Sequence, residues 1–175
     1  MKEPIDIMVL TFNRIKYMKM NLFMIHLWTK YPFRLVVIDN GSTDGTREWL
    51  RRMRDAGFIW KLIFSEENKM LTDTFSDNLK HIESEFFVTA ADDHMVPYIN
   101  HPYGEDVCWL TMLKATYDAN PDYASVNFYA TRQGFSPFRK KRWPHMVSLA
   151  DKKKLKELQE KVFDDGEYYG LDINV

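Results

Sequence analysis

The stretch from Phe86 to Val96 constrains the fold of this chain most strongly, because a short apolar run ends there in two adjacent carboxylates. The carboxylates belong to Asp92 and Asp93, and His94 follows them. An apolar run of this length is typical of a buried strand, and parallel α/β sheets bind ligands at the carboxyl ends of their strands. Neighbouring carboxylates need a compensating cation or hydrogen bonds, and Mg²⁺ and Mn²⁺ prefer oxygen ligands. The stretch therefore predicts either a cation and phosphate site or simply an acidic turn.

Apolar runs and helical periodicity alternate along the chain up to this acidic pair. Strands are expected over Ile5–Thr11, Arg34–Asp39, Phe58–Ser65 and Phe86–Ala91. Helices are expected from an Asn13 cap to about Lys30, from Thr46 to about Ala56, and along a face formed by Leu71, Phe75, Leu79 and Ile82. This alternation predicts an α/β fold with a mostly parallel, Rossmann-like central sheet, flanked by helices and joined by right-handed crossovers.

The second half of the chain has a less regular pattern. A helix with Val107, Leu110, Leu113 and Tyr117 on one face is expected to end at Asn120–Pro121, before a strand over Tyr123–Ala130. Residues 133–148 carry the basic run Arg139–Arg142 and are expected to form a solvated loop, a lid over a bound nucleotide, or a patch for anionic lipid. A last helix is expected from a Ser148 cap, with Val162 on its inner face. No repeat or linker is evident, so residues 1–175 are expected to form a single domain.

Charge and cysteine content exclude several classes of protein. A formal net charge of −1 gives no overall basic field for nucleic acid. The single cysteine, Cys108, rules out an intramolecular disulfide. The chain shows no secretory leader and no apolar run of about eighteen residues. These features lead us to expect a cytoplasmic protein that contacts a membrane at most peripherally.

Three separate stretches are expected to meet at the carboxyl edge of the sheet, namely 11–13, 39–42 and 92–94. Phe12 offers a face on which a base can stack, Asp39 can accept hydrogen bonds from a base or a ribose, and Asp92 or Asp93 can carry a cation. Backbone N–H groups at helix starts favour phosphate. Each feature also has a simpler explanation, since Phe12 can be a core residue, residues 39–41 only a turn, and Asp44 only a helix cap.

Three segments at these positions resemble the signatures of the family 2 glycosyltransferases, which have the GT-A fold. They are Val9–Arg14, Val36–Thr46 and Ala91–Asp93, and the second is the most specific of them. Trp109–Leu110, Asn120–Asp122 and the tail from Phe163 to Asp172 are similar to later parts of the family pattern. The resemblance covers the chain from about Ile5 to Val175.

The resemblance implies an enzyme that transfers a sugar from a nucleotide-diphosphate donor to a hydroxyl of a glycan or glycolipid acceptor, with inversion. The residues implied to bind the nucleotide sugar are Thr11, Phe12, Asn13, Asp39, Asn40, Gly41 and Asp92. Asp93, with Asp92, is implied to bind Mn²⁺ or Mg²⁺. Asp172 falls at the position of the catalytic base, which removes the proton of the acceptor hydroxyl.

The sequence departs from the family pattern at several positions. Ala90 replaces the first acid of an Asp-x-Asp motif, and Leu171 replaces the Glu of a Glu-Asp pair. Asp77 stands where many members have an arginine that binds phosphate, so Lys69 or the basic run 139–142 is expected to substitute for it. Since the chain stops three residues after Asp172, it is expected to be a minimal member, a shortened form of a longer protein, or a donor-binding domain with weak transfer activity.

Two other functions fit the same fold. A sugar nucleotidyltransferase requires a glycine-rich phosphate loop after the first strand, and residues 11–13 contain no such loop. A nucleotide-sugar-binding module without transfer activity would bind the donor but would not depend on Asp172. The role of His94 is left open between a metal or diphosphate ligand and a structural residue in a turn.

Overall fold

The computed structural model describes residues 2–94, 96, 108–122, 124–125 and 160–162. In this part of the chain the strands are β1 (Ile5–Thr11), β2 (Phe33–Asp39), β3 (Lys61–Phe64) and β4 (Phe87–Ala91). The helices are α1 (Ile15–Trp28), α2 (Thr46–Asp55), α3 (Leu71–Asn78) and α4 (Trp109–Asp118), with a 3-10 turn, η1, over Leu79–His81. The alternation of strands and helices predicted from the sequence is confirmed.

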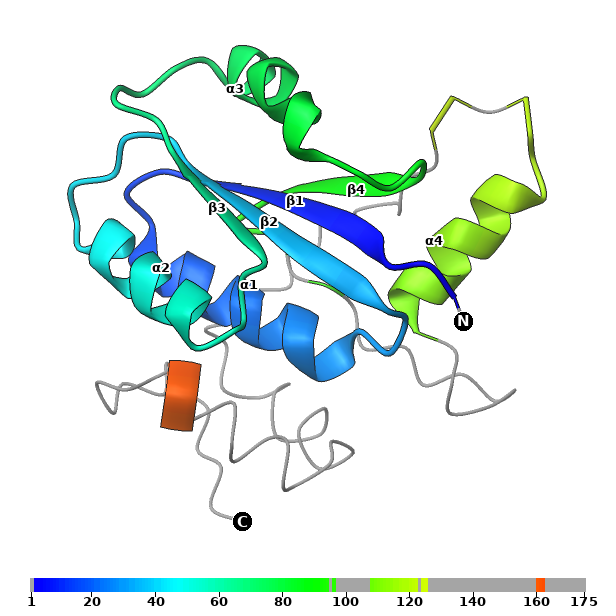
Figure 1. Ribbon diagram of the computed structural model, residues 1–175, viewed down its shortest axis with the longest axis horizontal. Helices are drawn as coiled ribbons and strands as arrows, with labels where there is room; N and C mark the ends of the chain where they lie inside the picture. Colours follow the sequence, from blue (N-terminus) through cyan, green and yellow to red (C-terminus); the bar gives the residue numbers. More distant parts are fainter. Residues whose placement is uncertain (1, 95, 97–107, 123, 126–159, 163–175) are drawn as a thin grey trace, which may run out of the picture.

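The four strands form one parallel sheet in the order β3–β2–β1–β4 (Figure 1). The chain moves outward from β1 through β2 to β3, and then returns to the other side of β1 to form β4. In register, Thr11 at the end of β1 lies beside Asp39, and Leu10 lies beside Ala91. The strand order therefore reverses between β1 and β4, and such a point is where open α/β sheets bind their ligands.

Alternate residues of the strands point to two different layers of helices. Ile7 and Val9 of β1 belong to a large core that includes residues of α1, α2 and α4, whereas Met8 and Leu10 belong to a smaller core with Phe75 of α3. Figure 1 shows α1 and α2 on one face of the sheet and α3 on the other. Because both faces are covered, the central strands β1 and β2 read as continuous apolar runs, as parallel strands usually do.

Helix α1 is buried more completely than a helix with one apolar face. Every residue from Met18 to Trp28 except His26 is buried, including the polar side chains of Lys19 and Asn21. Helix α1 packs on the sheet, and Leu110 of α4 and Val162 are buried in the same core. Helix α1 is therefore buried on more than one face, and segments distant in sequence contribute to the core around it.

Three further elements differ from the expectation. Strand β3 begins at Lys61 instead of Phe58. Strand β4 is less buried than its apolar sequence suggests, since Phe87 is 36% exposed. In α3 and η1 the expected apolar face is wrong at Leu71 and Leu79, which are exposed, whereas Phe75 and Ile82 pack against the smaller core. Polar contacts orient α3 instead, as described below.

Several predicted features lie outside the described residues. These are the irregular region with its basic run at 133–148, the start of the last helix, and most of the strand expected over 123–130. Residues 124–125 of that expected strand are described, and they are exposed and are not assigned to a strand. Residues 160–162 are helical, and Val162 is buried as expected. Within the part of the chain described here, no helix is both long enough and apolar enough to cross a membrane.

A buried ion pair joins three strands at the amino edge of the sheet. Asp6 on β1 is fully buried and accepts hydrogen bonds from Arg34 on β2, with Nε at 2.6 Å and Nη2 at 3.1 Å. It also accepts the backbone N–H groups of Glu83 and Ser84, just before β4. Burial raises the pKa of Asp6, but the hydrogen bonds from Arg34 and from the two backbone N–H groups outweigh this effect and lower it.

This pair is expected to make folding sensitive to acid. Because the pKa of Asp6 is lower in the folded chain than in the unfolded chain, its contribution is complete above the unfolded pKa and is lost as the pH falls through the folded value. Replacing Asp6 with Ala leaves Arg34 without its buried partner and is expected to lower the free energy of unfolding by about 3–5 kcal/mol at pH 7. Urea unfolding between pH 3 and pH 7 measures both effects.

Glu83 provides the control for this experiment, because its exposed carboxylate binds the same arginine. Glu83→Gln is expected to cost less than about 1 kcal/mol, as exposed pairs usually do. Equal losses for Asp6→Ala and Glu83→Gln would contradict the assignment of the stability to the buried carboxylate.

Candidate active site

Thr11 and Asp92 join the carboxyl ends of β1 and β4. The hydroxyl of Thr11 donates a hydrogen bond of 2.7 Å to Oδ2 of Asp92, and both side chains are buried. The backbone N–H of Asp92 donates to the carbonyl of Leu10 at 3.0 Å, which extends the pairing of the two strands by one step. Two of the residues predicted for the site therefore meet where the strand order reverses.

Asp92 and Asp93 have different environments although they are adjacent. Asp92 is 2% exposed, and burial raises its pKa, although the hydrogen bond from Thr11 and the charge of Arg14 act in the opposite direction. The side chain of Asp93 is 43% exposed. Nη1 of Arg14 lies 2.8 Å from Oδ2 of Asp93 and 3.5 Å from Oδ1 of Asp92. A guanidinium thus compensates the adjacent carboxylates.

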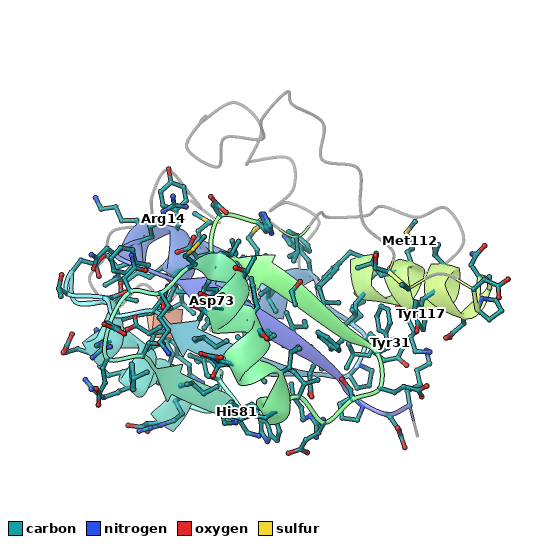
Figure 2. All side chains as sticks on the ribbon, turned by 90° about the horizontal axis from the view of Figure 1, so that it is seen from above. Arg14, Tyr31, Asp73, His81, Met112 and Tyr117 are labelled. Carbon is teal, nitrogen blue, oxygen red and sulfur yellow. The ribbon has the colours of Figure 1, made fainter. Side chains whose placement is uncertain are left out.

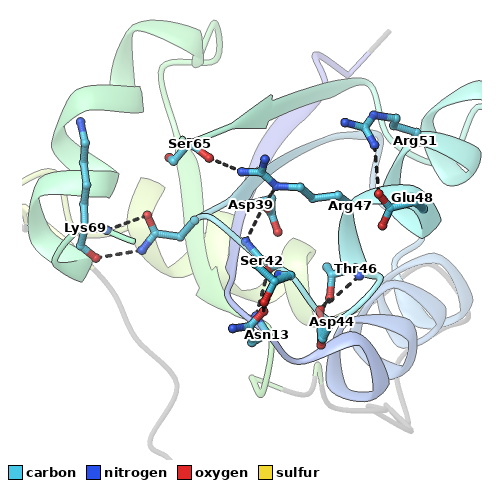
Figure 3. Close-up of polar contacts among 12 residues, drawn as sticks. Asn13, Asp39, Ser42, Asp44, Thr46, Arg47, Glu48, Arg51, Ser65 and Lys69 are labelled. Carbon is cyan, nitrogen blue, oxygen red and sulfur yellow. Dashed lines mark hydrogen bonds and ion pairs between the residues drawn. The ribbon is translucent and has the colours of Figure 1, made fainter. Parts of the chain in front are cut away.

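Asp39, at the end of β2, is a buried carboxylate with one free oxygen. Its Oδ1 atom accepts the N–H of Ser42 at 3.0 Å and Nε of Arg47 at 2.7 Å, while Arg47 also donates to the carbonyl of Ser65 (Figure 3). Its Oδ2 atom is buried and has no hydrogen-bond partner among the described residues. A buried acceptor without a partner is costly, which makes this oxygen a candidate ligand-binding atom.

The side chain of Asn40 holds the loop before α3 against the end of β2. Its Nδ2 atom donates to the carbonyl of Lys69 at 2.8 Å, and its Oδ1 atom accepts the N–H of Lys69 at 3.1 Å and the hydroxyl of Thr74 at 3.2 Å. Thr74 is buried for this reason, and α3 turns its polar residues inward. Gly41 has a φ of +92°, and an added Cβ would lie 2.9 Å from backbone atoms of both Glu67 and Asn68.

The starts of α1 and α2 are capped by one carboxylate. Asp44 accepts the N–H of Ile15 at 3.1 Å and, through its other oxygen, the N–H of Thr46 at 3.2 Å and the Thr46 hydroxyl at 2.5 Å. Burial raises the pKa of Asp44, but these hydrogen bonds outweigh burial and lower it. The expectation that Asn13 caps α1 was therefore wrong, because Asn13 lies outside the helix, has a φ of +50°, and instead accepts the N–H of Thr43 at 2.7 Å.

The remaining predicted positions behave differently from one another. Phe12 is 37% exposed, so its interpretation as a core residue is wrong and its ring is open to a ligand. Nδ1 of His94 accepts the N–H of Ala91 at 3.2 Å, and this hydrogen bond supports the structural interpretation of His94. Lys69 pairs with Asp77 at 3.2 Å on the surface. Asp172 and the basic run 139–142 lie outside the described residues.

Two arginines of this site were not identified from the sequence. Arg14 is only the last residue of the first motif, and no sequence pattern points to Arg47. Each contacts an acid of the site, but only Arg47 lies near its partner in sequence, eight positions after Asp39. Among the described residues, no group of three or more His, Cys, Asp or Glu side chains could hold a metal ion. A metal at Asp92 and Asp93 would therefore need ligands from elsewhere, such as water or phosphate oxygens.

Comparison with solved structures identifies the class of fold. TarS of S. aureus superimposes with a TM-score of 0.54 at 22% identity, covering 75% of this chain and 23% of TarS. The mannosyltransferase PcManGT of Pyrobaculum calidifontis gives a TM-score of 0.50 at 22% identity, covering 58% and 34% of the two chains. The sheet and its flanking helices thus have the GT-A fold of glycosyltransferases.

The family model for glycosyl transferase family 2 matches residues 6–170. The chain belongs to glycosyl transferase family 2, as the sequence signatures indicated. No curated protein sequence matches the chain. The chain spans about a quarter to a third of the length of the two solved proteins to which it is similar.

The close approach at Gly41 can be tested against a second glycine with a similar backbone. Gly57 has a φ of +84° and nothing within 4 Å of an added Cβ. Gly57→Ala is expected to cost about 1–2 kcal/mol of unfolding free energy from its left-handed backbone. Gly41→Ala is expected to cost about 1–3 kcal/mol more, because the methyl group also overlaps the backbone at 67–68. Equal losses in chemical unfolding would show that this loop moves freely away from Gly41.

Proposed function

We propose that this chain is an inverting glycosyltransferase that depends on a divalent metal and transfers a sugar from a nucleotide-diphosphate donor to a hydroxyl of a glycan or glycolipid. The observation that carries the proposal is the meeting of Thr11 and Asp92, next to Asp39, where the strand order of a family 2 fold reverses. Residues 1–175 would act as one catalytic domain. The cytoplasmic location and the peripheral membrane contact stay predictions from the sequence.

The nucleoside would bind between Phe12 and Asp39. The exposed ring of Phe12 offers a stacking surface, and Oδ2 of Asp39 would gain its missing partner from a base N–H or a ribose hydroxyl. Arg47 occupies the other oxygen of Asp39 and holds the carboxylate in place. Since Asp39 has no exposed area, a neighbouring group must move before a ligand reaches it.

Four of the residues implied to contact the nucleotide sugar already have partners within the protein. Asn13, Asn40 and Gly41 are engaged within the protein, so we propose that they position the loops and do not recognise the sugar directly. The hydroxyl of Thr11 donates a hydrogen bond to Asp92, so Thr11 can only accept a hydrogen bond from the nucleoside.

The donor atoms at Asp92 and Asp93 fit a hard divalent cation, because all of them are carboxylate oxygens. Asp93 is exposed and would be the main protein ligand, while Asp92 would contact the ribose or diphosphate or support the metal. Bound Mn²⁺ or Mg²⁺ would neutralise charge that develops on the leaving diphosphate. The mannosyltransferase PcManGT was solved in complex with GDP-Man and Mn²⁺.

Asp172 would act as the base of the transfer reaction. Its carboxylate would take the proton from the acceptor hydroxyl while that oxygen attacks the anomeric carbon, and the bond from this carbon to the diphosphate oxygen would break. The attack comes from the face opposite the leaving group, so the configuration inverts and no covalent enzyme intermediate forms.

Donor binding can be tested by thermal denaturation with nucleotide diphosphates and nucleotide sugars, each with Mn²⁺, Mg²⁺ or EDTA. One nucleotide is expected to raise the melting temperature in a metal-dependent manner, because it binds only the folded chain. Asp93→Asn should abolish this metal dependence, whereas Asp55→Asn, an exposed acid at the end of α2, should retain it. An unchanged response in Asp93→Asn would contradict the metal assignment.

Catalysis is tested separately at Asp172. Asp172→Asn is expected to lower kcat by about 10²–10⁴-fold, the usual contribution of a general base, and to leave the nucleotide affinity unchanged. Transfer would be measured as release of the nucleoside diphosphate with simple glycans and glycolipids as acceptors. Equal turnover in this variant would exclude Asp172 as the base. Donor binding without turnover in the wild-type chain would favour the binding-module alternative.

A further inference from the structure

Arg14 occupies the position that a bound cation would take at the acidic pair. One nitrogen of its guanidinium, Nη1, makes both contacts, at 2.8 Å from Asp93 and 3.5 Å from Asp92. The Arg14 side chain is 50% exposed and lies at the surface of the molecule (Figure 2). The ring of Tyr17, 5.8 Å from the guanidinium carbon, offers a second surface for the same group.

A divalent cation and this guanidinium require the same carboxylate oxygens. A metal bound to Oδ2 of Asp93 would lie within a few ångströms of the present position of Nη1, where two positive charges repel each other. The existing ion pair is exposed at both ends and is held by one nitrogen only, so it is weak and opens easily. Arg14 therefore weakens metal binding but does not prevent it.

A released guanidinium needs a new anion, and the donor diphosphate supplies one. Of two other cations near the site, Arg47 is held by the buried carboxylate of Asp39, and Lys69, which pairs with Asp77 at the surface, lacks the planar guanidinium. Asp77 stands where the family pattern places a phosphate-binding arginine, so that position supplies no cation. Arginine recognises phosphate oxygens through two parallel N–H groups, which is a better arrangement than its single-nitrogen contact with Asp93.

We propose that Arg14 is an internal counter-cation of the Asp92–Asp93 pair, which the metal displaces and which then binds the donor diphosphate. The ion pair keeps the two carboxylates close together before the ligand arrives. Metal binding and diphosphate binding would thus be coupled, because the metal releases the arginine that the diphosphate needs. The inference rests on the proposed metal and nucleotide site.

The test is the binding of Mn²⁺ alone to the wild-type chain and to Arg14→Met. Electron paramagnetic resonance of the free ion measures how much Mn²⁺ remains unbound. The variant keeps an aliphatic side chain and removes the competing charge. We expect it to bind Mn²⁺ about fivefold more tightly, the gain that follows from removing an exposed ion pair. Arg54→Met removes the same charge at the last turn of α2 and is expected to leave the affinity within about twofold.

The second measurement is the affinity for uridine and guanosine diphosphates at saturating Mn²⁺, by calorimetry. Arg14→Met is expected to bind the preferred nucleotide about tenfold more weakly, as the loss of a charge-assisted phosphate contact predicts. Arg14→Lys keeps a positive charge but lacks the planar guanidinium, so its nucleotide affinity should lie between those of the wild-type chain and Arg14→Met. The opposite signs of the two effects distinguish this role from a general loss of folding.

Two outcomes would overturn the inference about Arg14 alone, and a third would overturn the metal site on which it rests. Equal or weaker Mn²⁺ binding by Arg14→Met would show that Arg14 does not compete with the metal. Unchanged diphosphate affinity would show that Arg14 does not move to the phosphates. In both cases Mn²⁺ still binds and the proposed function stands. Absence of Mn²⁺ binding in every variant, with and without nucleotide, would instead overturn the metal site itself.

Discussion

The structure depends on carboxylates buried at the carboxyl edge of a parallel sheet. Asp39 and Asp92 lie at the ends of β2 and β4, and each has almost no exposed area. A buried carboxylate is stable only when hydrogen bonds or cations compensate it, so the surrounding loops must supply donors. Thr11 supplies one to Asp92, and Ser42 and Arg47 supply two to Asp39. The conformation of three loops thus follows from the need to satisfy two side chains.

The same need explains why polar contacts, and not apolar ones, orient the elements around the site. Asn40 binds the loop before α3 and turns Thr74 inward, which leaves Leu71 exposed. Asp44 caps α1 and α2 together and ties their starts to each other. On the sheet itself, apolar cores on both faces hold the strands. The apolar cores therefore support the sheet, and polar contacts shared between loops shape its carboxyl edge.

The two edges of the sheet use the same pair of residue types for different purposes. At the amino edge, Arg34 holds Asp6 through two nitrogens, and two backbone N–H groups complete its partners. At the carboxyl edge, Arg14 reaches Asp93 through one nitrogen in an exposed position. The first arrangement is buried and saturated, and it stabilises the fold. The second is exposed and incompletely bonded, which makes it suited to exchange with a ligand.

The sequence by itself determined the parallel α/β architecture, the family and the limits of β1, since these depend on short-range periodicity and on contiguous motifs. The tertiary structure alone decided which partners the site residues have. Asp44 caps α1 from 29 positions away, and Arg14 meets Asp93 across 79 positions. No local pattern encodes such pairs, because they arise only when parallel strands bring distant loops to one edge. The order of residues along the chain is enough to predict the fold. The partners of the site residues depend on how the loops meet at the carboxyl edge of the sheet.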